Sequence, residues 1–286
     1  MPTYALITPA HNEAQFIGEM IASVRRQTPQ PARWIIVDDG STDGTSDVIQ
    51  SLNIHRQIEV IRLPPKEMRA PGGEGAIGHA LRRLRLADYD FLARFDGDII
   101  LSDGYMAGIL GEFSKDAQLG IAGGELYIRT PKGEQREHYP GSHVRGALKL
   151  YRRECFADIG GLVSHIGWDT VDETYAQIYG WKTRTFPEYH AVHCRPTGAG
   201  ISSVHHYCEL GKADYLTWSD PLFVLLKSLK IATASGGPVN AVAFASSFAA
   251  CYAKRQTRVT DKRFREHRRR YQRARISAFL HHPWKA

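Results

Sequence analysis

Short apolar runs alternate with segments of helical period along the first hundred residues of the chain. The runs are Tyr4–Thr8, Trp34–Val37, Ile58–Leu63 and Phe91–Phe95. Between the first two, apolar residues recur at helical spacing behind Asn12, a candidate helix cap with Gln15 three positions on. This alternation predicts βαβ units around a parallel sheet, and hence an α/β fold.

Polar residues follow three of the predicted strands directly. Thr8–Glu13 follows the first run, Asp38–Gly44 the second and Asp96–Asp98 the fourth. In open α/β sheets ligands bind beyond the carboxyl ends of the strands. We therefore expect these three loops to meet at one edge of the sheet and to form the binding site.

Paired carboxylates in these loops suggest a charged ligand. Asp96 and Asp98 repel each other unless a cation lies between them, and Mg²⁺ or Mn²⁺ bridging a diphosphate would supply one. An ordinary Asp-Gly turn is the alternative. Asp38 and Asp39 can accept hydrogen bonds from a nucleotide base and a ribose, or they can simply favour a following helix.

The second half of the chain is less regular from about Gly120 onward. A strongly helical stretch, Asp169–Tyr179, ends at Gly180. A carboxylate at its start could accept the proton of an attacking hydroxyl, or it could only compensate the helix dipole. His193, after the apparent strand 190–192, is a candidate metal ligand, with a structural role as the alternative.

The C-terminal region combines an apolar stretch with a basic one. Glycines and a proline leave Val239–Ala253 as the only continuous part of the uncharged stretch, which is too short to span a bilayer. With Pro221–Leu229 it predicts two short helices. Lys254–Ala286 carries twelve Lys and Arg against two acids, a balance of +10 in a chain of net charge +7, so the rest sums to −3.

This charge distribution predicts peripheral attachment to an anionic membrane surface through residues 239–286. The alternative is a basic helix that packs on the protein's own acidic body. No recognition motif for nucleic acid accompanies the basic residues, so we expect no nucleic-acid partner. The four cysteines form no C-x-x-C pair and the N-terminus does not resemble a signal peptide, which favours the cytoplasm and the cytoplasmic face of the membrane.

Taken in order, the motifs Thr8–Glu13, Val37–Gly44, Asp96–Asp98 and Gly167–Lys182 resemble those of family 2 glycosyltransferases with the GT-A fold, over about Met1 to Arg195. The resemblance implies a mostly parallel sheet flanked by helices, with a helical C-terminal extension. We expect a glycosyltransferase domain over 1–200, divided into a nucleotide-sugar half (1–100) and an acceptor half (101–200), and a helical basic region over 201–286.

The resemblance also implies a reaction: inverting transfer of a sugar from a nucleotide-diphosphate donor, a UDP- or dTDP-sugar, to a hydroxyl of a glycan or lipid-linked acceptor in cell-surface polysaccharide synthesis. Asp98 and His193 would bind Mg²⁺ or Mn²⁺. Asp169 would be the base, with Asp172 as the alternative because Trp168 stands where the family usually has Glu. The residues expected to bind the donor are Thr8, Ala10, Asn12, Glu13, Asp38, Asp39, Asp96 and Arg195.

Two other functions are compatible with strand-end acids. A nucleotidyltransferase would normally need a Gly-rich basic loop after the first strand, and Thr8–Glu13 contains neither Gly nor Lys. A non-catalytic, membrane-associated nucleotide-binding protein is the second alternative, because acids in suitable places do not prove turnover.

Overall fold

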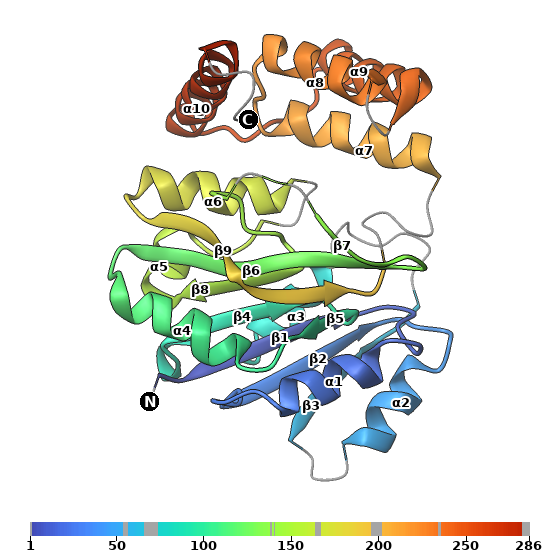
Figure 1. Cartoon of the computed structure of the whole chain (residues 1–286), viewed down its shortest axis with the longest axis vertical. Coiled ribbons are helices and arrows are strands. Elements are labelled where there is room, and N and C mark those ends of the chain that lie inside the picture. Colours follow the sequence, from blue (N-terminus) through green and yellow to red (C-terminus); the bar gives the residue numbers. More distant parts are fainter. Residues whose placement is uncertain are drawn as a thin grey trace. The chain divides into compact units, whose positions relative to one another are not determined.

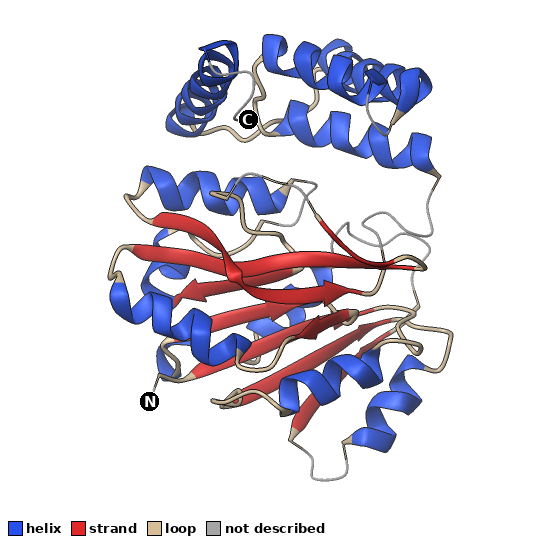
Figure 2. Cartoon of the chain, in the orientation of Figure 1, coloured by secondary structure: helices blue, strands red, loops and turns tan. Residues whose placement is uncertain are grey.

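The computed structural model describes residues 2–53, 57–65, 74–137, 139, 141–163, 167–195, 202–233 and 236–281. The chain packs as two compact units. The first comprises Met1–His165 with Tyr179–Pro196, and the second Ile166–Ile178 with Thr197–Ala286. Every described strand belongs to the first unit, and the described part of the second is helical (Figure 2).

The first half of the sheet is parallel, as the sequence predicts. Its strands lie in the order β3 (Ile58–Leu63), β2 (Arg33–Asp39), β1 (Tyr4–Ala10) and β4 (Phe91–Phe95), and all three pairings are parallel (Figure 1). β1, β2 and β4 are almost wholly buried, as is usual where helices cover a parallel sheet, whereas the edge strand β3 is mostly only partly buried. The helices of this unit are α1 (Ile17–Arg25), α2 (Thr45–Leu52), α3 (Glu74–Leu81), α4 (Tyr105–Lys115), α5 (Arg153–Asp158) and the short η2 (Leu86–Asp88).

The second half of the sheet mixes both pairings. Next to β4 follow β8 (Leu148–Arg152), β6 (Leu119–Thr130), β9 (Lys182–His193) and β5 (Ile99–Leu101), while β7 (Gly133–Arg136) pairs with β6. β8 runs antiparallel to both of its neighbours, and β5 runs antiparallel to β9, whereas β6 and β9 are parallel. β6 and β9, with twelve residues each, are the longest strands of this second half.

Two glycines allow β6 to approach its neighbours. A Cβ on Gly123 would lie 2.4 Å from the Leu148 carbonyl oxygen, and one on Gly124 would lie 2.0 Å from that of Tyr189. The β6–β9 register shifts between Gly124 and Glu125. Only glycine therefore fits at this bulge, which explains a glycine pair inside a twelve-residue strand.

The second unit consists of α6 (Trp168–Ile178), α7 (Ser203–Leu216), α8 (Pro221–Thr233), α9 (Gly237–Ala253) and α10 (Lys262–His281). α7, α8 and α9 share an apolar core formed by Tyr215, Val224, Phe244, Phe248 and Cys251. The helices that the sequence predicts in this region are confirmed. None of the described helices combines the length and the hydrophobicity that crossing a bilayer requires.

Helix α10 packs on α6 within this unit. The rings of Tyr175 and Phe264 lie 5.3 Å apart, and His267 Nε2 lies 3.0 Å from Gln177 Oε1. α6 therefore packs with the C-terminal helices, although it precedes β9 in the chain. Packing thus divides the chain differently from the expected boundary at residue 200.

The predicted cap of α1 is wrong. Asn12 has a left-handed backbone (φ 53°), and α1 begins behind Phe16 without a side-chain cap. The backbone N–H of Asn12 donates to Ser41 Oγ (3.0 Å), and Asn12 Oδ1 accepts from the backbone N–H of Thr42 (2.9 Å). Asn12 thus joins two loops instead of starting a helix, a role to which its tolerance of positive φ suits it.

Candidate functional site

The loops after β1 and β2 form one connected edge. Besides the Asn12 bonds, the backbone N–H of Glu13 donates to Thr45 Oγ1 (2.8 Å), and that of Ala14 donates to Asp43 Oδ2 (3.0 Å). Because β1, β2 and β4 are parallel, their carboxyl ends and the polar loops that follow them lie at the same edge of the sheet. The structure therefore brings together the loops that the sequence analysis singled out.

Asp98 lies beside His193 because β5 pairs with β9. Ile99 stands opposite His193 in this ladder, and the backbone N–H of Cys194 donates to the Asp98 carbonyl (3.0 Å). Asp98 Oδ2 lies 3.5 Å from His193 Nε2 and accepts a hydrogen bond from Arg195 Nε (3.1 Å). The end of β9 thus supplies two of the groups that face the Asp-Gly-Asp turn.

Arg195 joins Asp98 to Glu13, because Arg195 Nη2 donates a hydrogen bond to Glu13 Oε1. Both carboxyl groups are buried. Gly97 makes room for this contact, because a Cβ there would lie 3.1 Å from Glu13 Cγ. Glu13 and Gly97 are therefore fitted to each other, and the first loop reaches the turn after β4.

The pKa values of these two carboxyl groups, of Asp98 and Glu13, are shifted in opposite directions. Burial would raise the pKa of Asp98, but the hydrogen bond and charge of His193, together with Arg195, outweigh it and hold that pKa below its ordinary value. Burial and then the Asp98 charge raise the pKa of Glu13 to about 8, against the opposing effect of Arg195. Burial also lowers the pKa of His193, but Asp98 outweighs it and the net shift is upward.

These side chains fit a divalent ion bound together with a diphosphate. Glu13 Oε2 and His193 Nδ1 are buried without a hydrogen-bond partner in the described part of the chain. Neighbouring ligands of an octahedral Mg²⁺ lie roughly 3 Å apart, and the facing atoms of Asp98 and His193 are 3.5 Å apart. The described residues hold no ready group of three His, Cys, Asp or Glu ligands, so phosphate oxygens and water would complete the shell.

Asp96 pairs with an arginine that the sequence analysis missed. Arg94 Nη2 lies 3.0 Å from Asp96 Oδ1, and Arg94 Nη1 donates to the Gly146 carbonyl. Arg94 is buried within β4. The sequence does contain a signal for this pair: Arg94 is a charged residue inside an otherwise apolar strand, and a buried arginine needs a partner.

Some of the expected donor contacts are already used by the fold. Asp38 accepts from the backbone N–H of Ser41 (2.9 Å) and from the Ser46 hydroxyl. Buried Thr8 accepts a hydrogen bond from Trp34 Nε1 (3.1 Å). Ala10 and Asp39 are buried at the ends of β1 and β2. The Asp38 side chain thus supports the loop after β2, and the Thr8 side chain links β1 to β2. The contact of either side chain with a donor stays a prediction.

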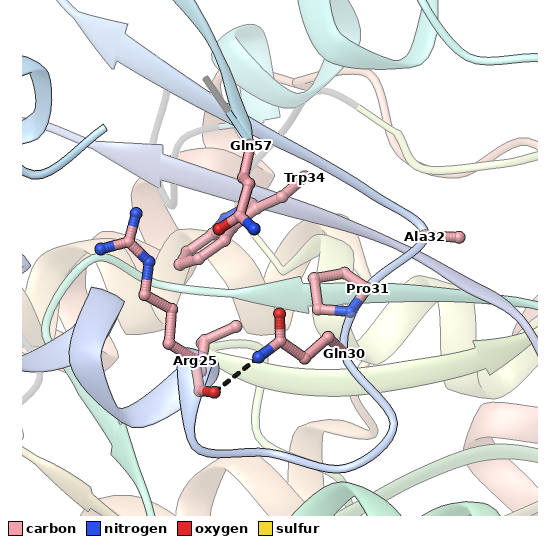
Figure 3. Close-up of a pocket in the computed structure, with 7 residues that line it drawn as sticks. Arg25, Gln30, Pro31, Ala32, Trp34 and Gln57 are labelled. Carbon is pink, nitrogen blue, oxygen red and sulfur yellow. Dashed lines mark hydrogen bonds between the residues drawn. The ribbon is translucent and has the colours of Figure 1, made fainter. Parts of the chain in front are cut away.

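A pocket elsewhere in the first unit does not belong to this edge. It is lined by the end of α1 with Arg25, by residues before β2 and β3 such as Gln57, and by Trp34 at the start of β2. Gln30 Nε2 donates to the Arg25 carbonyl there (2.6 Å) (Figure 3). These residues lie at the amino ends of the strands. Ligands of open α/β sheets bind at the opposite ends.

The two candidate bases lie on α6 and differ in exposure. Asp169 is half-buried in the first turn, whereas Asp172 is only 3% exposed and accepts from the backbone N–H of Glu173 (2.6 Å). Gly167 (φ 83°) precedes the helix, and a Cβ there would lie 3.0 Å from Thr217 Cγ2. Of the two residues, Asp169 is the more exposed to solvent.

A nucleotide-binding α/β sheet with paired acids at its carboxyl edge, extended by a mixed second half, defines the GT-A class of sugar-transferring folds. Residues 5–168 match the family described as Glycosyl transferase family 2. The chain therefore belongs to glycosyltransferase family 2.

The chain is also similar to curated and solved proteins. The poly-beta-1,6-N-acetyl-D-glucosamine synthase of Staphylococcus epidermidis is 19% identical over 201 residues, which cover 64% of this chain and 46% of that protein. The chain thus spans about half of this relative.

Two solved structures share the fold. The mannosyltransferase PcManGT from Pyrobaculum calidifontis in complex with GDP-Man and Mn²⁺ has a TM-score of 0.58 at 18% identity, covering 99% of this chain and 87% of that one. GalNAc-T7 with UDP, GalNAc and Mn²⁺ has a TM-score of 0.62 at 14% identity, covering 98% and 57%. At these identities the likeness establishes the fold alone.

Proposed function

We propose that the chain transfers a sugar, with inversion, from a nucleotide-diphosphate sugar to a hydroxyl of a glycan or lipid-linked acceptor in cell-surface polysaccharide synthesis. The single observation that carries the donor class is the cluster of Asp98, His193, Arg195 and Glu13. It gathers two acids, an imidazole and a guanidinium at the carboxyl edge of the sheet. Such a cluster suits a diphosphate that arrives with its cation.

In this proposal the acceptor oxygen forms a bond to the anomeric carbon while the bond from that carbon to the diphosphate oxygen breaks. Asp169 takes the proton of the attacking hydroxyl, and the leaving nucleotide diphosphate keeps the electron pair. Arg195 supplies a fixed positive charge for the developing negative charge. A divalent ion, when bound by Asp98 and His193, supplies additional positive charge to the diphosphate. The partial exposure of Asp169 supports it over buried Asp172 as the base.

The donor is expected to be a UDP- or dTDP-sugar. Asp39, Asp96 and the loop of Asn12 and Glu13 stand at the edge where the base, ribose and diphosphate would lie. The solved neighbours hold UDP in one case and GDP-Man in the other, so a test must include all three nucleotides. The family assignment favours this function over the nucleotidyltransferase and non-catalytic alternatives.

The full chain incubated with a panel of UDP-, dTDP- and GDP-sugars tests this function directly. The nucleotide diphosphate released is measured with Mn²⁺, with Mg²⁺ and with a chelator. We expect metal-dependent release from a UDP- or dTDP-sugar. Release from no donor, or release that the chelator leaves unchanged, would contradict the proposal.

The protein's second partner in this proposal is the anionic cytoplasmic face of a membrane, contacted through residues 239–286. The +10 balance of Lys254–Ala286 supports it. Each basic residue near an anionic surface contributes about 1 kcal/mol, within a Debye length of roughly 8 Å at physiological salt. A lipid-linked acceptor would be held at the same surface.

A further inference from the structure

Helix α8 carries an apolar stripe that faces solvent. Leu222, Leu225, Leu226 and Leu229 are 51%, 56%, 36% and 55% exposed. They recur at steps of three and one, so they lie on one side of the helix. Four exposed leucines on two turns are unusual for a surface that only water contacts, and such patches mark interaction sites.

The opposite side of α8 is what holds the helix in the fold. Val224 is buried in the core of the second unit. Lys227 Nζ bonds to buried Asp214 Oδ2 (2.6 Å) and lies 4.9 Å from the centre of the Phe244 ring. The leucine stripe is therefore not needed to hold α8 in place. The side of α8 with Val224 and Lys227 packs on the unit, so the side with the leucines faces solvent.

The apolar stretch predicted to meet the membrane, Val239–Ala253, is mostly turned inward. Its two phenylalanines, Phe244 and Phe248, are buried in the core that α9 shares with α7 and α8. Among its large side chains only Val239, Val242 and Tyr252 are exposed. Four of the eight large apolar side chains that are exposed in the described part of the second unit thus lie on α8, outside residues 239–286.

The basic helix α10 adjoins the start of the stripe. Arg273 Nε bonds to Asp220 Oδ2 (2.9 Å), and Asp220 Oδ1 accepts from the backbone N–H of Leu222 (3.0 Å). The guanidinium of Arg275 lies 5.7 Å from the centre of the Phe223 ring. One side of α10 presents further basic residues: Lys262, Arg265, Arg269, Arg270 and Arg273, with Glu266 among them.

We propose that the leucine stripe of α8 inserts into the interface of an anionic bilayer, with the arginines of α10 on the lipid headgroups beside it. This inference deepens the membrane attachment proposed above and rests on it. The combination of an apolar stripe with an adjoining cationic helix is the pattern of elements that lie in a membrane interface.

A second copy of the chain is less suited than an anionic bilayer to cover the leucine stripe. A two-fold dimer joins the same surface of both copies. Helix α10 has eight Lys and Arg against one Glu, so pairing two stripes would bring two helices of like charge toward each other. An anionic bilayer instead complements this charge.

The test compares the full chain with the double variant Leu225→Gln/Leu229→Gln in co-sedimentation with phosphatidylcholine vesicles, with and without phosphatidylglycerol, across a salt series. The matched control is Val204→Gln, which removes an apolar side chain that is 44% exposed on α7. We expect the affinity of the double variant for anionic vesicles to fall by about tenfold or more. We also expect this variant to lose the part of its vesicle binding that persists at high salt. The control should bind as the wild type does.

Two results would overturn the inference. The first is equal vesicle binding of the double variant and the wild type, or no binding of either. The second is a wild-type dimer in vesicle-free sedimentation that the leucine changes convert to monomer. Release of nucleotide from the donor panel, measured on the same variants, keeps the two proposals apart. Normal vesicle binding without donor turnover contradicts only the proposed transfer, and the reverse contradicts only the membrane inference.

Discussion

Asp98 Oδ2 and His193 Nε2 lie 3.5 Å apart, although Asp98 follows β4 and His193 ends β9, almost a hundred residues later. The antiparallel pairing of the short β5 with β9 creates this contact. Because Arg195 follows on the same strand end and reaches both Asp98 and Glu13, three distant segments share one cluster of charges. The chemistry proposed for the site depends on this arrangement.

Replacing Asp98 by Asn should abolish metal-dependent binding of the donor. The neutral amide removes one ligand charge, while the size of the side chain and the β5–β9 ladder are kept. Calorimetry with a UDP-sugar and Mn²⁺ measures the effect, and circular dichroism checks the fold. Asp103→Asn, which changes a carboxylate that is 83% exposed, is the control and should bind normally. An unchanged affinity of the Asp98 variant with metal present would show that the residue is not a ligand.

Asp169→Asn should retain donor binding and lose transfer. A positioned base typically contributes about 10²–10⁴ in rate, so single-turnover transfer should slow by that order while the affinity for the donor stays near that of the wild type. Asp172→Asn is the companion variant. If it loses more transfer than the Asp169 variant at equal stability, the role of the base passes to Asp172.

The parallel half of the sheet follows closely from the sequence. The runs Ile58–Leu63 and Phe91–Phe95 coincide with β3 and β4, and Gly180 has the positive φ (87°) expected after a helix. These features depend on local periodicity and on the backbone freedom of glycine, which a sequence displays directly.

The mixed half of the sheet depends on pairings between distant strands, which periodicity does not encode. The β6–β9 ladder, the bulge at Gly124 and the antiparallel β5 set the place of His193. The bond between Arg195 and Glu13 joins the last strand to the first loop. We expect each of these two residues to contact the donor, but no feature of the sequence indicates that they contact each other.

The role of the basic tail also needed tertiary contacts. Charge alone predicts a helix for an anionic surface, but Phe264 of α10 is fully buried and Gln272 Oε1 accepts from the backbone N–H of Asp220 (2.7 Å). The structure thus gives α10 a packing role on α6 besides its charge. The arginines could be counted from the sequence, whereas the burial of Phe264 could not.

Phe264→Ala should destabilise the second unit. Truncating a buried phenylalanine typically costs about 3–5 kcal/mol, and here the change also removes the contact with Tyr175 on the helix that carries Asp169. Urea unfolding followed by circular dichroism measures the loss, and transfer should fall with it. Arg265→Ala alters an exposed neighbour and serves as the control. Wild-type stability of the Phe264 variant would mean that α10 does not support α6.

The buried pair of Asp214 and Lys227 should make the stability of the second unit depend on pH. Burial would raise the pKa of Asp214, but Lys227 and the Ser219 hydroxyl, which donates to Oδ1 (2.7 Å), hold it below its ordinary value. The unfolded chain therefore binds a proton at a higher pH than the folded one. The stabilisation is present above about pH 4 and is lost as the pH falls through the lowered pKa.

Removing this carboxylate leaves Lys227 without its buried partner, so Asp214→Asn should lower the free energy of unfolding by about 3–5 kcal/mol at pH 7. The difference from the wild type should shrink as the pH is lowered from 4 toward 3, because the unfolded wild type takes up a proton on Asp214 in this range before the folded one does. Urea unfolding of both proteins at several pH values measures it, with the exposed Asp103→Asn as a control that should cost little at any pH. A difference that stays constant down to pH 3 would mean that the ion pair does not stabilise the fold and that the variant acts only through altered packing.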